Sequence, residues 1–143
     1  MMEIKLILDQ NVLDQYNKYY FRLHPRASKK PIDRPLHPSM NTWMRLPRMQ
    51  MNQLKQKWKD LICWWIDSLG YSDLNIDKYT LECMTYMPTK RRFDPDNSSI
   101  KFIADGLVDS GFLVDDSGDH MEALILKTGY DKEWPRTEIT IKY

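Results

Sequence analysis

Cysteine is scarce in this sequence, and long apolar runs are missing. The only two cysteines, Cys63 and Cys83, and the three scattered histidines exclude a disulfide framework and a Cys/His zinc site. Both cysteines lie in apolar segments, so we expect buried free thiols. No apolar run approaches the ~18 residues of a membrane-spanning helix, and the first residues lack the layout of a signal peptide. These absences predict a reducing, cytoplasmic setting without membrane association.

Acidic residues are nearly absent from residues 18–59, where eleven Lys and Arg residues stand against Asp33 alone. Residues 94–119 reverse the balance, with seven Asp residues against Lys101. A basic region suits a polyanion, whereas an acidic cluster repels one unless a cation intervenes. The pattern therefore favours a metal-dependent protein that acts on nucleic acid. Two solvated faces that attract one another would give the same pattern.

The periodicity predicts one α+β domain over residues 1–143, with a mixed or antiparallel sheet flanked by helices in the order β-α-β-α-β-β. Residues 10–41 read as a short helix near 11–21 followed by a basic, Pro-rich loop or insert. The apolar stripe of residues 48–69 is typical of a helix that packs its Trp side chains in the core. The remaining elements are a strand at 3–8, a strand at 79–87, a helix that Asp96 or Asn97 caps and Gly111 ends, and a hairpin of strands 121–127 and 137–143.

Carboxylates occur at both ends of the helix that precedes Gly111. Asp94 and Asp96 enter it, and Asp115 and Asp116 follow it. A helix of about 13 residues spans roughly 20 Å, so the two ends meet only if the chain runs back beside the helix or if the flanking segments are neighbours in the sheet. If they meet, their oxygen donors suit Mg²⁺ or Mn²⁺, which activate water and polarise phosphate.

Basic side chains lie near these acids. Lys101 is one turn into the helix, on the face of Asn97 and Asp105, where it could hold a phosphate. Arg91 and Arg92 precede the acids and could hold flanking DNA backbone.

Other interpretations of the acidic segment remain open. DPDN and DDSG are both good turn sequences, so a structural role explains their acids. A calcium loop starting at Asp94 would have Ser99 where glycine is required and Asp105 in place of glutamate. A DxD nucleophile should follow an apolar strand, but Lys90, Arg91 and Arg92 precede this one.

The segment RRFDPDNSSIKFIADGLVDSGFLVDDS, residues 91–117, resembles the signature of RusA-type Holliday-junction resolvases. That signature has basic residues, D-x-D-N, a lysine, D-[AG]-L, G-[FVI] and D-D in order. A second segment, PSMNTWMRLPRMQMNQLKQKWKDLI from Pro38 to Ile62, is similar to the family's P-S-x-N segment and the basic helix after it. The gap from Asp96 to Lys101 is one residue longer than in the best-known members.

The resemblance implies a Mg²⁺-dependent homodimer, with Mn²⁺ as a substitute, that nicks four-way DNA junctions in recombination or repair, often in phages and prophages. It implies metal binding by Asp94, Asp96, Asp115 and Asp116, and catalysis by Asp94, Asp96, Asp116 and Lys101. The expected DNA contacts are Lys90, Arg91, Arg92, Asn97, Asn41, Arg45 and Arg48. A DNA-binding module without catalysis and a structural partner protein are the alternatives.

Overall fold

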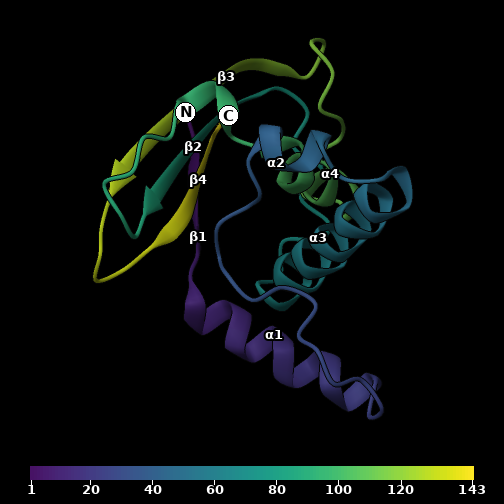
Figure 1. Ribbon diagram of the computed structural model, residues 1–143. Coiled ribbons are helices and arrows are strands. Elements are labelled where there is room, and N and C mark those ends of the chain that lie inside the picture. The colour runs from purple at the N-terminus through teal and green to yellow at the C-terminus, as the bar shows by residue number, and fades with distance from the viewer.

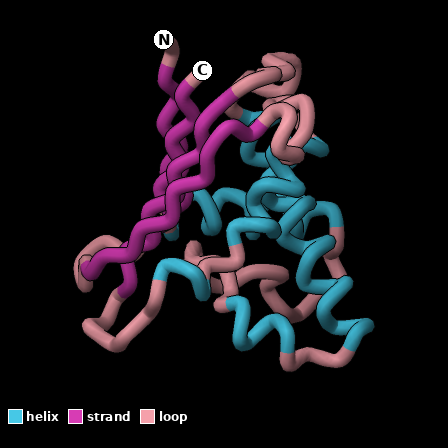
Figure 2. Tube along the Cα trace, turned by 90° about the horizontal axis from the view of Figure 1, so that it is seen from above, coloured by secondary structure: helices cyan, strands magenta, loops and turns pink.

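The chain forms a four-stranded sheet with helices packed against one face (Figures 1 and 2). The computed structural model describes residues 1–143. This arrangement confirms the predicted α+β class with a mixed sheet. The elements are β1 (Glu3–Leu8), α1 (Gln10–Leu23), α2 (Met40–Met44), α3 (Arg48–Ser68), β2 (Tyr79–Met87), the 3-10 helix η1 (Pro95–Asn97), α4 (Ile100–Asp109), β3 (Met121–Tyr130) and β4 (Arg136–Lys142).

The sheet has the strand order β1-β4-β2-β3. β4 pairs antiparallel with β1 and β2, and β2 pairs parallel with β3. The predicted hairpin of the last two strands is therefore wrong, because β2 lies between them. Residues Arg136–Ile141 are all buried, which suits a strand with neighbours on both sides, whereas β3 is a largely exposed edge strand. The connection from β2 to β3 is a crossover that places α4 over the sheet. The acidic segment of residues 94–97 lies on this connection, immediately before α4.

The core lies between the sheet and α3 with α4. Trp58, Trp65 and their apolar neighbours on α3 are almost fully buried, as the stripe predicts. The two helices approach closely at Gly106, where an added Cβ would lie 2.5 Å from the Cβ of Ile62. Cys83 is a buried free thiol as expected, but Cys63 is only half-buried. None of the helices is both long and apolar enough to cross a membrane.

The predicted basic loop runs between α1 and α2 and separates the basic residues of positions 18–59 into two groups. α1 packs through Tyr16 on Trp64 of α3, with ring centroids 5.3 Å apart. The chain then runs from α1 along the molecule to α2, which lies near α4 (Figure 1). The bases on α1 are thus separated from Arg45, which follows α2, and from those at the start of α3.

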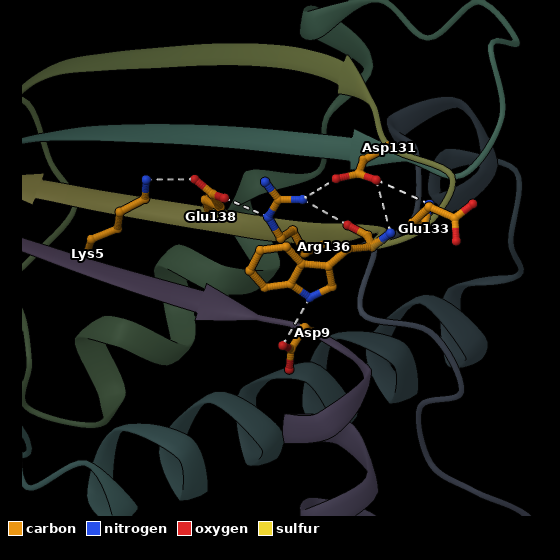
Figure 3. A network of polar contacts seen from close by, with 7 residues as sticks. Lys5, Asp9, Asp131, Glu133, Arg136 and Glu138 are labelled. Carbon is orange, nitrogen blue, oxygen red and sulfur yellow. Dashed lines mark hydrogen bonds and ion pairs between the residues drawn. The ribbon is translucent and has the colours of Figure 1, made fainter.

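A network of ion pairs and hydrogen bonds links side chains on the face of the sheet that the helices do not cover (Figure 3). The guanidinium of Arg136 lies between the rings of Tyr86 and Trp134, 3.9 and 4.0 Å from their centroids. It also donates to Glu138 at 2.6 Å and to Asp131 at 2.9 Å. These contacts satisfy a nearly buried charge, so Arg136 has a structural role.

The same network ties the first strand and first helix to the last strand. Lys5 of β1 pairs with Glu138 at 2.9 Å. Asp9 accepts hydrogen bonds from the Trp134 indole at 3.2 Å and, as the N-cap of α1, from the Val12 N–H at 3.1 Å. The entry angle of α1 is therefore fixed by side chains from the other end of the chain.

Candidate metal and nucleic-acid site

The acids of the D-x-D-N segment lie on a short 3-10 turn before α4. Pro95 begins η1, and Asp94 and Asp96 are both exposed. The predicted caps are wrong: α4 starts at Ile100 with Ser99 at the N-cap, so it has 10 residues. The reason is that the Asn97 side chain binds elsewhere, and Asp96 lies within the preceding turn.

The Asn97 side chain joins the two segments that carry the family resemblance. Its Oδ1 accepts the backbone N–H of Asn41 at 3.0 Å. Ser39 and Ser98 form an isolated antiparallel bridge beside this bond. The P-S-x-N and D-x-D-N segments, 56 residues apart at this bond, thus lie side by side. Together they line a hollow of about 360 Å³ with the residues Met40, Asn41, Arg92, Asp94, Asp96 and Asn97.

A buried histidine, which the sequence analysis did not single out, supports this junction. His37 is 4% exposed, and its Nδ1 accepts the Ser99 N–H at 3.1 Å. Its proton therefore lies on Nε2, which is 3.1 Å from Ser98 Oγ and 3.2 Å from Thr85 Oγ1. Burial lowers the pKa of His37 to about 4, so the ring is neutral at pH 7. His37 thereby fixes the start of α4 against β2.

The chain after Gly111 runs back beside α4, which is one of the two routes that the sequence analysis considered. It brings Asp116 to within 4.0 Å of Lys101, in the first turn of α4. Gly111 has φ +86°, and a Cβ there would collide with the Ser72 backbone oxygen, so the reversal requires glycine. The chain then pairs Leu113 in parallel with Ile76. The Tyr79 hydroxyl donates to the Asp115 carbonyl at 2.7 Å and anchors the pair to the start of β2.

Lys101 connects the returning pair to the first turn of α4. Its Nζ lies 3.2 Å from Asp105 Oδ1 and 4.0 Å from Asp116 Oδ2. Asp115 is turned to the backbone, because its Oδ1 accepts the Asp116 N–H at 2.8 Å, and this bond lowers the pKa of the Asp115 carboxyl. The structure thus brings Lys101 and Asp116 together.

The three acids do not form one cluster in this conformation. No three Asp, Glu, His or Cys side chains lie close enough together to hold a metal ion. The Asp94 carboxylate is engaged by Arg92 through two bonds of 3.0 and 3.3 Å, both exposed. Magnesium in proteins commonly binds through one or two carboxylates and keeps several waters. Asp94 and Asp96, which both line the hollow, fit that requirement, and Asp116 lies outside the hollow.

Six of the seven expected DNA contacts are exposed, whereas Asn97 is half-buried and its Oδ1 accepts the Asn41 N–H. Lys90, Arg91 and Arg92 are exposed on the loop after β2, and Lys90 lies 5.4 Å from the ring centroid of Tyr130. Arg45 follows α2 and Arg48 begins α3, both exposed. These five side chains are exposed, and none of them makes a buried hydrogen bond or ion pair.

Comparison of the chain with known protein families and with curated proteins found no match.

Proposed function

We propose that this chain is a Mg²⁺-dependent endonuclease that hydrolyses phosphodiester bonds in branched DNA as a homodimer. One observation carries the proposal: the P-S-x-N and D-x-D-N segments meet through the Asn41–Asn97 bond. Their meeting builds a hollow that contains two carboxylates. If D-x-D-N were only a turn sequence, it would have no reason to contact the P-S-x-N segment. The contact between these distant segments therefore supports the resemblance.

Each group has a role that follows from its position. Asp94 and Asp96 would hold Mg²⁺, with Mn²⁺ as a substitute, and the bound ion would supply activated water and stabilise charge on phosphate. Arg92 would exchange Asp94 for a DNA phosphate and so free the carboxylate. Lys101 would hold the phosphate that is cut, between the hollow and Asp116. Arg91 and Lys90 would hold the backbone beside it.

The test is nicking of a synthetic four-way junction with Mg²⁺. Asp94→Asn, Asp96→Asn and Asp116→Asn should each abolish nicking and leave junction binding in gel shifts intact or tighter, because negative charge near phosphate is removed. Asp119→Asn, an exposed acid after the D-D pair, is the matched control and should cut normally. Cleavage near the wild-type rate in any two of the three variants would overturn the assignment.

A DNA-binding module without catalysis is the second candidate. The Arg92–Asp94 pair and the separation of Asp116 from the hollow favour it. Wild-type protein that binds junctions tightly but cuts none with either Mg²⁺ or Mn²⁺ would establish this second function. A protein that binds no junction at low salt would exclude both.

A further inference from the structure

The acidic hollow that Asp94 and Asp96 line is built from elements too short to hold their own shape. α2 has 5 residues and η1 has 3, whereas isolated helices shorter than roughly 12–15 residues are marginal in water. The contacts inside the hollow are exposed and hold little: Arg92 pairs with Asp94, and the Asn97 side chain binds the Asn41 N–H. The positions of the two carboxylates must therefore be set by residues beneath the hollow.

His37 is the buried group that joins the two segments beneath the hollow. It is 4% exposed and lies two residues before Ser39, whose backbone forms a bridge with that of Ser98. Its Nδ1 accepts the Ser99 N–H at 3.1 Å, and its Nε2 lies 3.1 Å from Ser98 Oγ. Ser98 follows η1 directly, and Ser99 is the N-cap of α4. One side chain beside the P-S-x-N segment thus contacts both residues that follow the D-x-D-N segment.

The His37 ring is itself fixed by the sheet. Its Nε2 also lies 3.2 Å from Thr85 Oγ1 on β2, and Thr85 is 1% exposed. The Thr137 hydroxyl of β4 donates to the Pro35 carbonyl at 3.0 Å, two residues before His37. The two inner strands of the sheet therefore hold the histidine, and the histidine holds the turn that carries the acids.

The contacts of His37 allow one orientation of its ring. The Ser99 N–H can only donate, so Nδ1 must accept and Nε2 carries the proton. A ring turned over by a half rotation would place carbon atoms at both points of contact. The support beneath Ser98 and Ser99 is therefore rigid, in contrast to the exposed contacts inside the hollow.

We propose that His37 is a positioning residue that holds the turn of Asp94 and Asp96 in the geometry that binds a divalent metal ion. The inference rests on the proposed function, in which these two acids bind Mg²⁺. His37 does not line the hollow, so it acts through Ser98 and Ser99 and not as a ligand. Outer partners of this kind orient the groups that touch a metal, and their loss weakens metal binding.

The test is Mn²⁺ binding to the folded protein at pH 7.5 without DNA, measured by the electron paramagnetic resonance signal of free Mn²⁺. His37→Ala should weaken binding about tenfold, the lower end of the effect of losing such a partner. His37→Asn should bind more tightly than His37→Ala, because its Oδ1 replaces Nδ1 as the acceptor of the Ser99 N–H. If His37→Ala does not fold, His37→Gln replaces it, because its amide takes the place of Nε2 and leaves the Ser99 N–H without an acceptor.

Two control variants separate positioning from a general loss of stability. Leu13→Ala removes a fully buried side chain of α1, at the opposite end of the helical layer from α2, and should destabilise the fold but bind Mn²⁺ as wild type. Ser99→Ala removes a buried hydroxyl that has no partner and keeps the N–H that His37 accepts, so it should also bind as wild type. Each titration is run at a temperature where circular dichroism shows the variant to be folded.

The outcomes distinguish this inference from the proposed function. Wild type that binds Mn²⁺ no better than Asp94→Asn lacks the proposed metal site, and both proposals then fail. If wild type binds through Asp94, the positioning role alone is overturned when His37→Ala binds as tightly as wild type, or when Leu13→Ala loses as much affinity as His37→Ala. It is also overturned if His37→Asn binds no better than His37→Ala.

Discussion

Lys101 has two carboxylate neighbours, and they give it two possible roles. The ion pair with Asp105 is an ordinary i,i+4 surface contact, worth only about 0.3–0.5 kcal/mol. The approach to Asp116 places its ammonium beside an acid of the proposed centre. A charge that is positioned before the reaction can contribute a few kcal/mol to the transition state. The rate of cleavage therefore distinguishes the two roles.

We expect Lys101→Ala to bind junctions almost normally but to cut them on the order of 10²-fold more slowly. Single-turnover cleavage at saturating enzyme measures this. Lys127→Ala is a matched control, because Lys127 is 58% exposed against 60% for Lys101 and pairs with an acid of its own, Glu82. A rate within about threefold of wild type, against the ~10²-fold that a preorganised charge supplies, would show that Lys101 only pairs with Asp105.

His37 predicts how stability depends on pH. Its pKa is lowered to about 4 in the folded chain by burial, below its ordinary value of 6.5. The unfolded chain therefore binds the proton first, so the neutral ring contributes stability above pH 6.5 that is lost as pH falls toward 4. The loss amounts to about 3 kcal/mol. Protonation of Nδ1 would also break the bond from the Ser99 N–H.

Urea unfolding of wild type and His37→Asn at pH 7.5 and 4.5 checks this expectation. The variant should be less stable at pH 7.5 because it loses the ring contacts. The difference between the two proteins should shrink at pH 4.5, since only the wild type loses the His37 contribution. Equal differences at both pH values would contradict the assignment.

Residue-level features of the site were predictable only where they repeat a pattern. Asp94, Asp96 and Asp116 are predicted site residues because they recur in a known order, and that assignment stays a prediction. His37 was missed because its partners are 48, 61 and 62 residues away, and a single histidine gives no spacing to read. Lys101 was placed on the face of Asp105 correctly from helical geometry alone, but its approach to Asp116 depends on the reversal at Gly111.

At the scale of elements, the contact between α3 and α4 depends on Gly106. A Cβ at Gly106 would lie 2.5 and 2.8 Å from two atoms of Ile62, which is fully buried. We expect Gly106→Ala to destabilise the fold by about 1–2 kcal/mol, because overpacking outweighs the better helix propensity of alanine.

Equilibrium unfolding in urea measures this loss. Gly118→Ala is the control and should change stability little, since nothing lies within 4 Å of its added Cβ. Gly106→Ala with wild-type stability would mean that α4 moves away from α3 without cost.

Elements with strong periodicity were predicted well, whereas pairings were not. β2 was placed at its observed bounds, and α3 was predicted within one residue, because both bury a regular stripe. The pairing of β4 with β1 and β2 was missed, because the short loop between β3 and β4 suggested a hairpin. The cap of α4 was also missed, because the Asn97 side chain binds Asn41 from a distant segment.

At the scale of the whole molecule, the separation of the basic groups limits how many of them one DNA duplex can contact. Arg45 and Arg48 are exposed between α2 and the start of α3, and Lys90, Arg91 and Arg92 are exposed on the loop before Asp94, whereas α1 lies at the opposite end of the helical layer from α2 (Figure 1). With about four phosphate contacts, log K for junction binding should fall with log salt at a slope of about −3.6. Gel shifts over a range of salt concentrations measure it, and a slope shallower than about −2 would mean that this surface is not the DNA surface.

Because the first strand pairs with the last, β1 cannot join the sheet until almost the whole chain has been synthesised. Leu8 at the end of β1 is matched with Thr137 at the start of β4, so β1 has no partner until the ribosome has reached that far. At about 5–20 residues per second, β1 waits on the order of 6 to 26 seconds. During that interval its apolar residues are exposed to other chains. The N-terminal strand of the nascent protein therefore needs protection from other chains for longer than any later strand.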